Sequence, residues 1–361
     1  MVFNSIFFIF CFLPVFMLIY YLVPGKLRNL LLFLGSLFFY AWGEPVYVIL
    51  MLFSSIFNYY MGTELERLYY DDRKQKINLI FSIIINLAVL VFFKYYGFLL
   101  NTIGGITGIH IPHPELSLPI GLSFYTFRNL SYLFDIYLSK VNAQRNFLTF
   151  AVYSTMFPYT SAGPIVRYTD IETQLKQRTI NISKFGIGAE LFVKGLAKKV
   201  LLADNLSVLY SSICGHPQMS VFTSWLGILA YTMQLYFDFS GYSDMAIGLG
   251  KMLGFDFNKN FDYPYISTSV SEFWRRWHIS LGSWFRDYIY IPLGGNRVST
   301  LKHIRNILVV WALTGLWHGA SWNFVLWGVY YGLFLLLEKF VLQKYLKKTP
   351  SWLCTVYTML V

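Results

Sequence analysis

The sequence predicts an all-α, polytopic membrane protein, because its composition is apolar, its apolar runs are long, and those runs contain little charge. Of the 361 residues, 56% are hydrophobic and only 13% are charged, whereas soluble domains carry about 25% charged residues. Runs of about 18 or more nearly uncharged residues are typical of transmembrane helices. We expect about nine such segments, all within one transmembrane domain that covers residues 1–361.

The basic residues favour a membrane partner over nucleic acid. Lys and Arg number 29 against 18 Asp and Glu, which gives a formal net charge of +11. Most of these cations lie in short gaps between apolar runs, a pattern typical of loops beside an anionic membrane face. We therefore expect membrane lipid, and not nucleic acid, as a partner. The 28 Tyr and 10 Trp residues suit either interfacial belts or an aromatic-lined cavity.

The first apolar run sets the expected orientation. It extends from Phe3 to Val23, and Lys26 and Arg28 follow it directly. Nothing basic precedes it and it is long enough to span, so it does not resemble a signal peptide. Because positively charged loops remain on the cytoplasmic side, we expect the residues before this run to lie outside.

The later runs are separated by polar gaps or by Gly and Pro. Residues 30–60 contain Gly43-Glu44-Pro45, so we expect two segments that are bent or broken there. Residues 77–100 should span, with Lys94 near the end where its ammonium can snorkel, and residues 101–116 should form a loop. Residues 351–361 are apolar but too few to cross a bilayer, so we expect a chain truncated at its C-terminus. The other expected segments are 119–137, 147–164, 185–213, 221–253, 271–292 and 306–337.

Four charged residues inside these runs need protein or water around them, since charge facing lipid costs several kcal/mol. Arg128 and Asp135 lie on one face of their expected helix. Asp238 and Asp244 follow in a later run. We expect these two carboxylates to lock helices together, with the Arg275/Arg276 pair as a possible cationic partner.

The first group of residues suited to chemistry is Trp317-His318-Gly319. A histidine inside an apolar segment needs a partner even when neutral, and desolvation favours the neutral form, which can act as a base. Gly315 and Gly319 remove side-chain bulk one turn apart, where a ligand or another helix could approach. A catalytic histidine and a structural one both remain open at this point.

The second group runs from Ser271 to His278 and concentrates charge and indole rings. Glu272 and Arg276 are four residues apart and can pair on a helix. Trp274 and His278 have the same spacing, so the indole can pack on the imidazole. An interfacial amphipathic helix is the alternative interpretation.

Helix geometry places the two histidines at similar depth. His278 lies fourteen residues before Pro292, roughly 21 Å, and His318 lies twelve residues after Asn306, roughly 18 Å. In a hydrocarbon core roughly 30 Å thick, both reach the middle. If both segments cross steeply, the imidazoles can share one polar site; the charges around His278 make a re-entrant path equally possible.

Other catalytic signatures are absent from the sequence. It contains no P-loop, no Rossmann glycine pattern, no Gly-x-Ser-x-Gly elbow and no zinc-ligand spacing. Cys11, Cys214 and Cys354 are far apart and form no disulfide or metal pattern. We expect no metal site.

Taken together, these motifs resemble the membrane-bound O-acyltransferase (MBOAT) family, and within it the bacterial branch typified by the membrane subunit of alginate O-acetylase. The likeness runs over nearly the whole chain. The stretches that carry it are Pro119–Phe127, Tyr236–Asp244, Ser271–Leu281 with Ile291–Arg297, and Leu316–Gly328.

The resemblance implies a helical fold with re-entrant segments around a central tunnel, in the inner (cytoplasmic) membrane of a bacterium. It places the essential histidine at His318 and a second polar position at His278. The implied reaction transfers an acyl group, expected to be acetyl, from acyl-CoA or another thioester to a hydroxyl of a cell-surface polysaccharide. No bound cofactor is implied, and extracytoplasmic acetylation proteins are possible partners.

Around the histidines we predict two sets of supporting residues. The two arginines of the second group, with Arg297 and Arg305, could guide a phosphate-bearing donor, although the positive-inside rule explains them equally well. The predicted substrate-binding residues are Trp274, Arg275, Arg276, Asn296 and Trp317, and the predicted structural polar residues are Asp238, Asp244 and Glu272.

Other functions remain open. The same fold could carry out D-alanyl or peptidoglycan O-acyl transfer. A proton-coupled transporter could use His278, His318, Asp238 and Asp244 as a relay, although we detect no inverted repeat in the sequence. A non-catalytic scaffold for an export complex is a third possibility.

Overall fold

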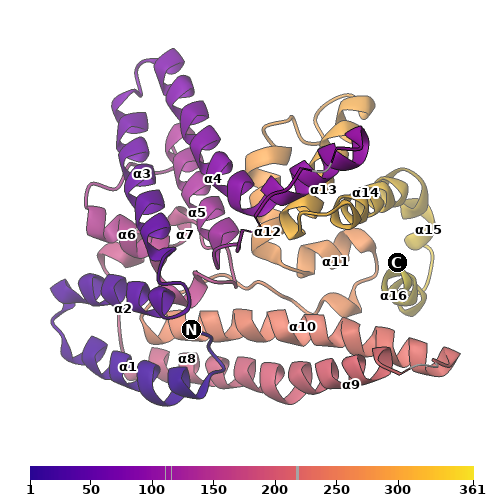
Figure 1. Ribbon diagram of the computed structural model, residues 1–361, viewed down its shortest axis with the longest axis horizontal. Helices are drawn as coiled ribbons and strands as arrows, with labels where there is room; N and C mark the ends of the chain where they lie inside the picture. Colours follow the sequence, from indigo (N-terminus) through magenta and orange to yellow (C-terminus); the bar gives the residue numbers. More distant parts are fainter. Residues whose placement is uncertain (110, 115, 217–218) are drawn as a thin grey trace. The chain divides into compact units, whose positions relative to one another are not determined.

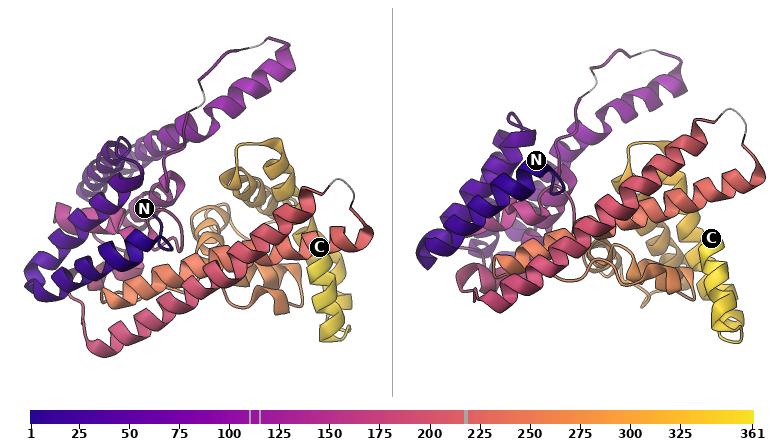
Figure 2. Two further views of the ribbon diagram at one scale, coloured as in Figure 1. Left: turned by 60° about the horizontal axis from the view of Figure 1, so that its bottom comes forward. Right: turned by 90° about the horizontal axis from the view of Figure 1, so that it is seen from below.

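The computed structural model describes residues 1–109, 111–114, 116–216 and 219–361 (Figures 1 and 2). Within these ranges the regular structure is helical and contains no strand, which confirms the predicted all-α class. The chain divides into two compact units, residues 1–56 with 144–259 and residues 57–143 with 260–361. The first of the three boundaries along the chain falls inside α3 (Val48–Arg67).

Unit 1 (residues 1–56 and 144–259) has an aromatic core. The ring of Phe157 lies 5.5 Å from that of Phe39 and 5.3 Å from that of Phe16, and the backbone N–H of Phe157 donates to the Ser36 hydroxyl at 3.0 Å. Its helices are α1 (Leu13–Leu22), α2 (Arg28–Gly43), α6 (Phe147–Thr155), α7 (Tyr168–Lys176), α8 (Ile182–Ala197), α9 (Asp204–Cys214) and α10 (Val221–Met252), with the π-helical turns η1 (Phe8–Phe12) and η4 (Lys198–Ala203) and the 3₁₀ turns η2 (Gly25–Leu27) and η3 (Phe157–Tyr159).

Glycines bring α8 and α10 into backbone contact. A Cβ on Gly188 would lie 2.6 Å from the Gly248 carbonyl oxygen, and one on Gly195 would lie 2.5 Å from that of Gly241. The two glycines on each helix are seven residues apart and so recur on one face. Figure 2 shows the two helices lying side by side, a close approach that small residues permit in membrane proteins.

Lysines of η4 neutralise the two carboxylates of α10. The Lys198 ammonium lies 2.6 Å from the Asp244 carboxylate, and the Lys199 ammonium lies 2.9 Å from that of Asp238. The expected partnership with the Arg275/Arg276 pair is therefore wrong, because lysines of the adjacent segment within the same unit take these positions.

Unit 2 (residues 57–143 and 260–361) surrounds the buried helix α5 (Leu122–Tyr137). Arg128 and Asp135 are 0% and 1% exposed, so both charges face protein, as predicted. The Tyr288 hydroxyl donates to Asp135 at 2.9 Å, and the Trp284 indole donates to the Phe127 carbonyl at 2.9 Å. The other elements are α4 (Asp72–Thr107), η5 (Pro264–Ile266), α11 (Val270–Arg276), α12 (Ile279–Phe285), η6 (Arg286–Tyr290), α13 (Thr300–His318), α14 (Trp322–Leu337), η7 (Glu338–Leu342), α15 (Gln343–Leu346) and α16 (Ser351–Leu360).

Three helical stretches of the described residues are long and apolar enough to cross a membrane, namely Val48–Arg67, Asp72–Thr107 and Trp322–Leu346. The break at Gly43-Glu44-Pro45 is confirmed, since α2 ends at Gly43 and α3 begins at Val48. α4 is longer than predicted, because it continues to Thr107 through residues expected to form a loop. Two other predicted segments are broken inside the active-site region described next.

Candidate active site

His278 lies at a break between two short helices. α11 ends at Arg276 and α12 begins at Ile279, and His278 between them has φ +44°, in the left-handed region. A non-glycine residue in that region costs about 1–3 kcal/mol and is concentrated at functional sites. The prediction of one helix through residues 271–292 is therefore wrong, and the expected packing of Trp274 on His278 through helical spacing does not apply.

The start of α11 is held firmly. The Glu338 carboxylate accepts the backbone N–H groups of Val270 and Ser271, at 2.5 and 2.9 Å, and the Ser269 hydroxyl accepts that of Glu272 at 3.0 Å. These acceptors satisfy donors that a helix N-terminus leaves free and complement its dipole. The short helix is thus anchored at the end opposite His278.

The His278 imidazole is buried and has a defined partner. It is 3% exposed, and its Nδ1 lies 3.1 Å from the amide oxygen of Asn260. The same oxygen accepts the backbone N–H and the hydroxyl of Ser280, at 3.2 and 2.8 Å. Asn260 was not anticipated from the sequence, since a loop contact across eighteen residues has no periodic signal.

His318 is the last residue of α13, and the chain reverses immediately after it into α14. The two helices meet at Gly315 and Gly328: a Cβ on Gly315 would overlap the Phe324 carbonyl oxygen and would lie 3.3 Å from the Gly328 Cα. The prediction of one apolar segment over residues 306–337 is therefore wrong. The close approach inferred from the glycines is present, and the approaching group is the next helix.

Trp317 connects the two histidines. Its ring centroid lies 5.6 Å from that of His278 and 4.9 Å from that of His318, both edge-on. The ring of Trp327 in α14 also packs edge-on against His318, with the ring centroids 4.9 Å apart. Both imidazoles are thus brought together by aromatic packing, although neither lies within a straight membrane-crossing helix.

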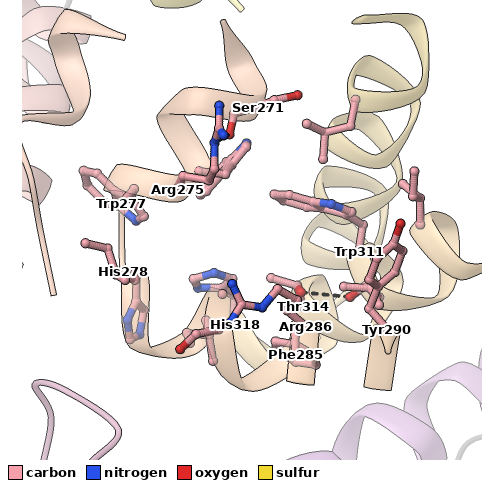
Figure 3. A pocket seen from close by; sticks show the side chains of 18 of the residues that line it. Ser271, Arg275, Trp277, His278, Phe285, Arg286, Tyr290, Trp311, Thr314 and His318 are labelled. Carbon is pink, nitrogen blue, oxygen red and sulfur yellow. Dashed lines mark hydrogen bonds between the residues drawn. The ribbon is translucent and has the colours of Figure 1, made fainter. Parts of the chain in front are cut away.

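Both histidines line one cavity of about 650 Å³, and Figure 3 shows their rings bordering the same space. The His318 side chain is exposed, and its ring faces this cavity. The described residues that line the cavity include three cations and no carboxylate. Besides the histidines, the polar and aromatic lining consists of Ser271, Trp274, Arg275, Trp277, Ser283, Phe285, Arg286, Tyr290, Trp311, Thr314 and Lys339.

Some predicted binding residues lie at this cavity and others do not. Trp274 and Arg275 line it. Arg276 instead pairs with Glu272 at 2.8 Å, which confirms that predicted ion pair. Asn296 is exposed in the turn before α13, and Trp317 packs against both imidazoles; neither is among the described lining residues.

Several lining residues were missed from the sequence. Thr314 and Trp311 precede His318 by four and seven residues, so helical spacing could have identified them. Arg286 and Lys339 come from η6 and η7, and only the folded chain brings them to the cavity. Across the described residues, no cluster of three or more His, Cys, Asp or Glu could hold a metal ion.

A second cavity, of about 900 Å³, lies between α4 and the turn that follows His318. Its aromatic lining includes Phe93, Tyr96, Phe98 and Trp322, and its polar lining includes Lys94, Asn101, Thr102, His113 and Ser321. Ala320 and Ser321 belong to this cavity, whereas His318 belongs to the first. The residues on the two sides of Gly319 therefore border different cavities.

The model of the membrane-bound O-acyltransferase family matches residues 45–350. The chain belongs to this family. A probable alginate O-acetylase of Pseudomonas aeruginosa is 44% identical over 343 residues, which cover 94% of this chain and 66% of that protein. The peptidoglycan O-acetyltransferase of Helicobacter pylori is 35% identical over 374 residues, 94% of this chain and 70% of that protein.

A teichoic acid D-alanyltransferase of Bacillus subtilis is 29% identical over 264 residues, 68% of this chain and 64% of that protein. The chain thus spans about two thirds of the length of these relatives. Family membership and the apolar helices together make it a multi-pass membrane protein.

Proposed function

We propose that this protein is a membrane O-acyltransferase that transfers an acetyl group from a thioester donor to a hydroxyl of a cell-surface polysaccharide. One observation carries the proposal: His318 and His278 border one cavity in a chain 44% identical to a probable alginate O-acetylase. The D-alanyl and peptidoglycan acceptors of other relatives are the alternatives, and the higher identity favours polysaccharide.

His318 is the base in this mechanism. A sugar hydroxyl is a poor nucleophile until a base within hydrogen-bond reach takes its proton. His318 accepts that proton, the hydroxyl oxygen bonds to the thioester carbonyl carbon, and the carbon–sulfur bond breaks. The departing thiolate then recovers the proton from His318. The step requires the neutral form of the His318 imidazole, since a protonated ring cannot accept a proton.

His278 supports this step as a hydrogen-bond acceptor. Its Nδ1 is engaged by Asn260, so a neutral imidazole offers its Nε2 lone pair to an N–H of His318 or to the acceptor hydroxyl. Polarisation of the thioester carbonyl by His278 is the less favoured role, because it would require a protonated ring.

The cations of the first cavity suit an anionic donor. Arg275, Arg286 and Lys339 can bind the phosphates of acyl-CoA by charge-assisted hydrogen bonds. The second cavity, with aromatic faces beside amide and hydroxyl groups, suits a sugar acceptor. Donor and acceptor then approach the residues around His318 from separate spaces.

The proposed membrane arrangement keeps about nine segments around a tunnel that includes these cavities, in the inner membrane of a bacterium. The broken helices at His278 and after His318 are consistent with re-entrant segments, because irregular backbone at membrane depth is tolerated where protein or water surrounds it. Extracytoplasmic proteins that carry or modify the glycan are the proposed partners.

His318→Gln tests the proposal, because it keeps a hydrogen-bonding amide and removes the titrating imidazole. We expect the full-length variant to insert and melt like the parent but to lose transfer by about 10²–10⁴-fold, measured as O-acetyl groups on the cell-surface glycan by mass spectrometry. His216→Gln, at an exposed histidine of unit 1, is the matched control. Near-parental acetylation by well-folded His318→Gln would contradict the proposal. Proton flux across vesicles that contain the protein, without any acyl transfer, would support a transporter instead.

A further inference from the structure

Two neighbouring residues of α4 close the C-terminal end of α13. The Tyr95 hydroxyl donates to the Leu316 carbonyl oxygen at 2.7 Å, and the Lys94 ammonium donates to the Trp317 carbonyl oxygen. The last carbonyl groups of a helix have no partner within it, and here two of them are satisfied from another helix. The Trp317 carbonyl belongs to the peptide group that leads directly into His318.

This placement of Lys94 differs from the snorkelling position expected from the sequence. α4 continues to Thr107, so Lys94 lies well inside it rather than near its end. The ammonium also lies 5.6 Å from the centre of the Trp317 ring, within the range of a cation–π interaction. Lys94 is partly buried, and these partners offset the cost of removing part of its ammonium from water.

The charge matters because of where His318 sits. A helix C-terminus carries partial negative charge and stabilises a protonated histidine. A protonated His318 could not act as a base. An ammonium bound to the adjacent carbonyl opposes that effect, since two like charges at short range repel.

We propose that Lys94 is a positioning residue for His318, closing the end of α13 so that the imidazole stands beside the cavity in its neutral form. The inference rests on the proposed function of His318 as a base. Tyr95 donates an uncharged hydrogen bond to the carbonyl of Leu316, one residue before Trp317. Variants of Tyr95 and Lys94 can therefore distinguish the effect of losing a hydrogen bond from the effect of losing a charge.

Other titratable groups line the same cavity as His318. They are His278 from the α11–α12 break, Arg275 from α11, Arg286 and Tyr290 from η6, and Lys339 from η7. None of the described lining residues carries a carboxylate. All of these cations border a cavity, and Lys94 borders the second one. Lys94 differs because it is bonded to the peptide group that precedes His318, so its removal should have the larger effect on the imidazole.

The test measures the protonation of His318 directly. Diethyl pyrocarbonate modifies neutral imidazole, and mass spectrometry of the peptide that contains His318 gives the labelled fraction at each pH, in the purified full-length protein. In Lys94→Gln we expect the pH at which half of His318 is labelled to rise by about one pH unit. Lys94→Arg should keep the parental midpoint, and so should Tyr95→Phe, which removes a hydrogen bond without removing charge.

Acyl transfer provides the second readout, with radiolabelled acetyl-CoA and an alginate oligosaccharide as probes. In Lys94→Gln the acid limb of the pH–rate profile should move to higher pH by the same amount as the labelling midpoint. Lys94→Arg should keep the parental profile. An unchanged midpoint in Lys94→Gln, or an equal shift in Tyr95→Phe, would overturn the proposal. If Lys94→Gln does not fold, Lys94→Met removes the same charge; failure of both to fold while Lys94→Arg folds would make the lysine a structural support only and would also overturn it.

These results are separable from the proposed function. A parent that labels as expected but transfers no acetyl group, whether from acetyl-CoA or from a cell extract, would contradict the acyltransferase and leave the effect of Lys94 on His318 intact. An active parent whose Lys94→Gln variant titrates normally would contradict only the role of Lys94.

Discussion

The Nδ1 atom of His278 and the amide oxygen of Asn260 are 3.1 Å apart, and this contact determines which tautomer the histidine adopts. The oxygen also accepts the backbone N–H of Ser280, a group that can only donate, so it must be an acceptor toward Nδ1 as well. Nδ1 therefore carries the proton, and Nε2 of the neutral ring is left as an acceptor.

The first prediction follows from this tautomer. Because His278 accepts a hydrogen bond but is not the base, His278→Ala should lose less acyl transfer than His318→Ala. Both are compared as purified proteins with equal melting temperatures. A larger loss in His278→Ala would show that the base is assigned to the wrong histidine.

The second prediction concerns the cations of the first cavity. Arg286→Gln and Lys339→Gln should each raise KM for acetyl-CoA about tenfold, since a hydrogen bond to a charged group contributes roughly 1.5–3 kcal/mol. KM for a short uncharged acetyl thioester should change little. Lys302→Gln, at an exposed lysine outside the cavity, is the control, and equal effects on both donors would argue against phosphate recognition.

The third prediction tests the crossing of α13 and α14. Gly315→Ala introduces a methyl group that would overlap the Phe324 carbonyl oxygen. Overpacking of this kind costs about 1–3 kcal/mol and should displace His318, so both the melting temperature and acyl transfer should fall. Gly186→Ala, where a Cβ meets nothing within 4 Å, should behave like the parent; an unaffected Gly315→Ala would show that the helices do not cross so closely.

The fourth prediction concerns the Lys198–Asp244 pair, whose side chains are 32% and 28% exposed. A double-mutant cycle with Lys198→Met and Asp244→Asn, measured on the free energy of unfolding, should give a coupling free energy of roughly 0.5–1 kcal/mol. Folded Asp244→Asn should retain acyl transfer. Abolished transfer without loss of stability would instead give Asp244 a functional role, as in a proton relay.

The fifth prediction is the orientation of the first segment. In a variant with Cys11→Ser and Cys214→Ser, which removes the two exposed cysteines, a cysteine at the exposed Val2 should react with a membrane-impermeant thiol reagent in intact cells. The reason is the positive charge of Lys26 and Arg28 after the segment. Labelling only after lysis would reverse the topology.

Local patterns predicted several features correctly. The break after Gly43, the Glu272–Arg276 pair and the burial of Arg128 and Asp135 all follow from spacing or from the cost of charge in lipid. The two histidines do reach one cavity, but not for the predicted reason, since both segments are broken near them.

Apolar runs and charge spacing thus determined by themselves that this is a helical membrane protein. The resemblance carried by four sequence stretches indicated the acyltransferase family and implied His318 as the candidate base. Only the tertiary structure decided that Asn260 holds His278, that Lys94 and Tyr95 close α13, and that Arg286 and Lys339 reach the cavity. The reason is physical: hydropathy and helical periodicity act between residues a few positions apart, whereas these contacts join residues far apart in the chain and form only when the backbone breaks and the helices pack.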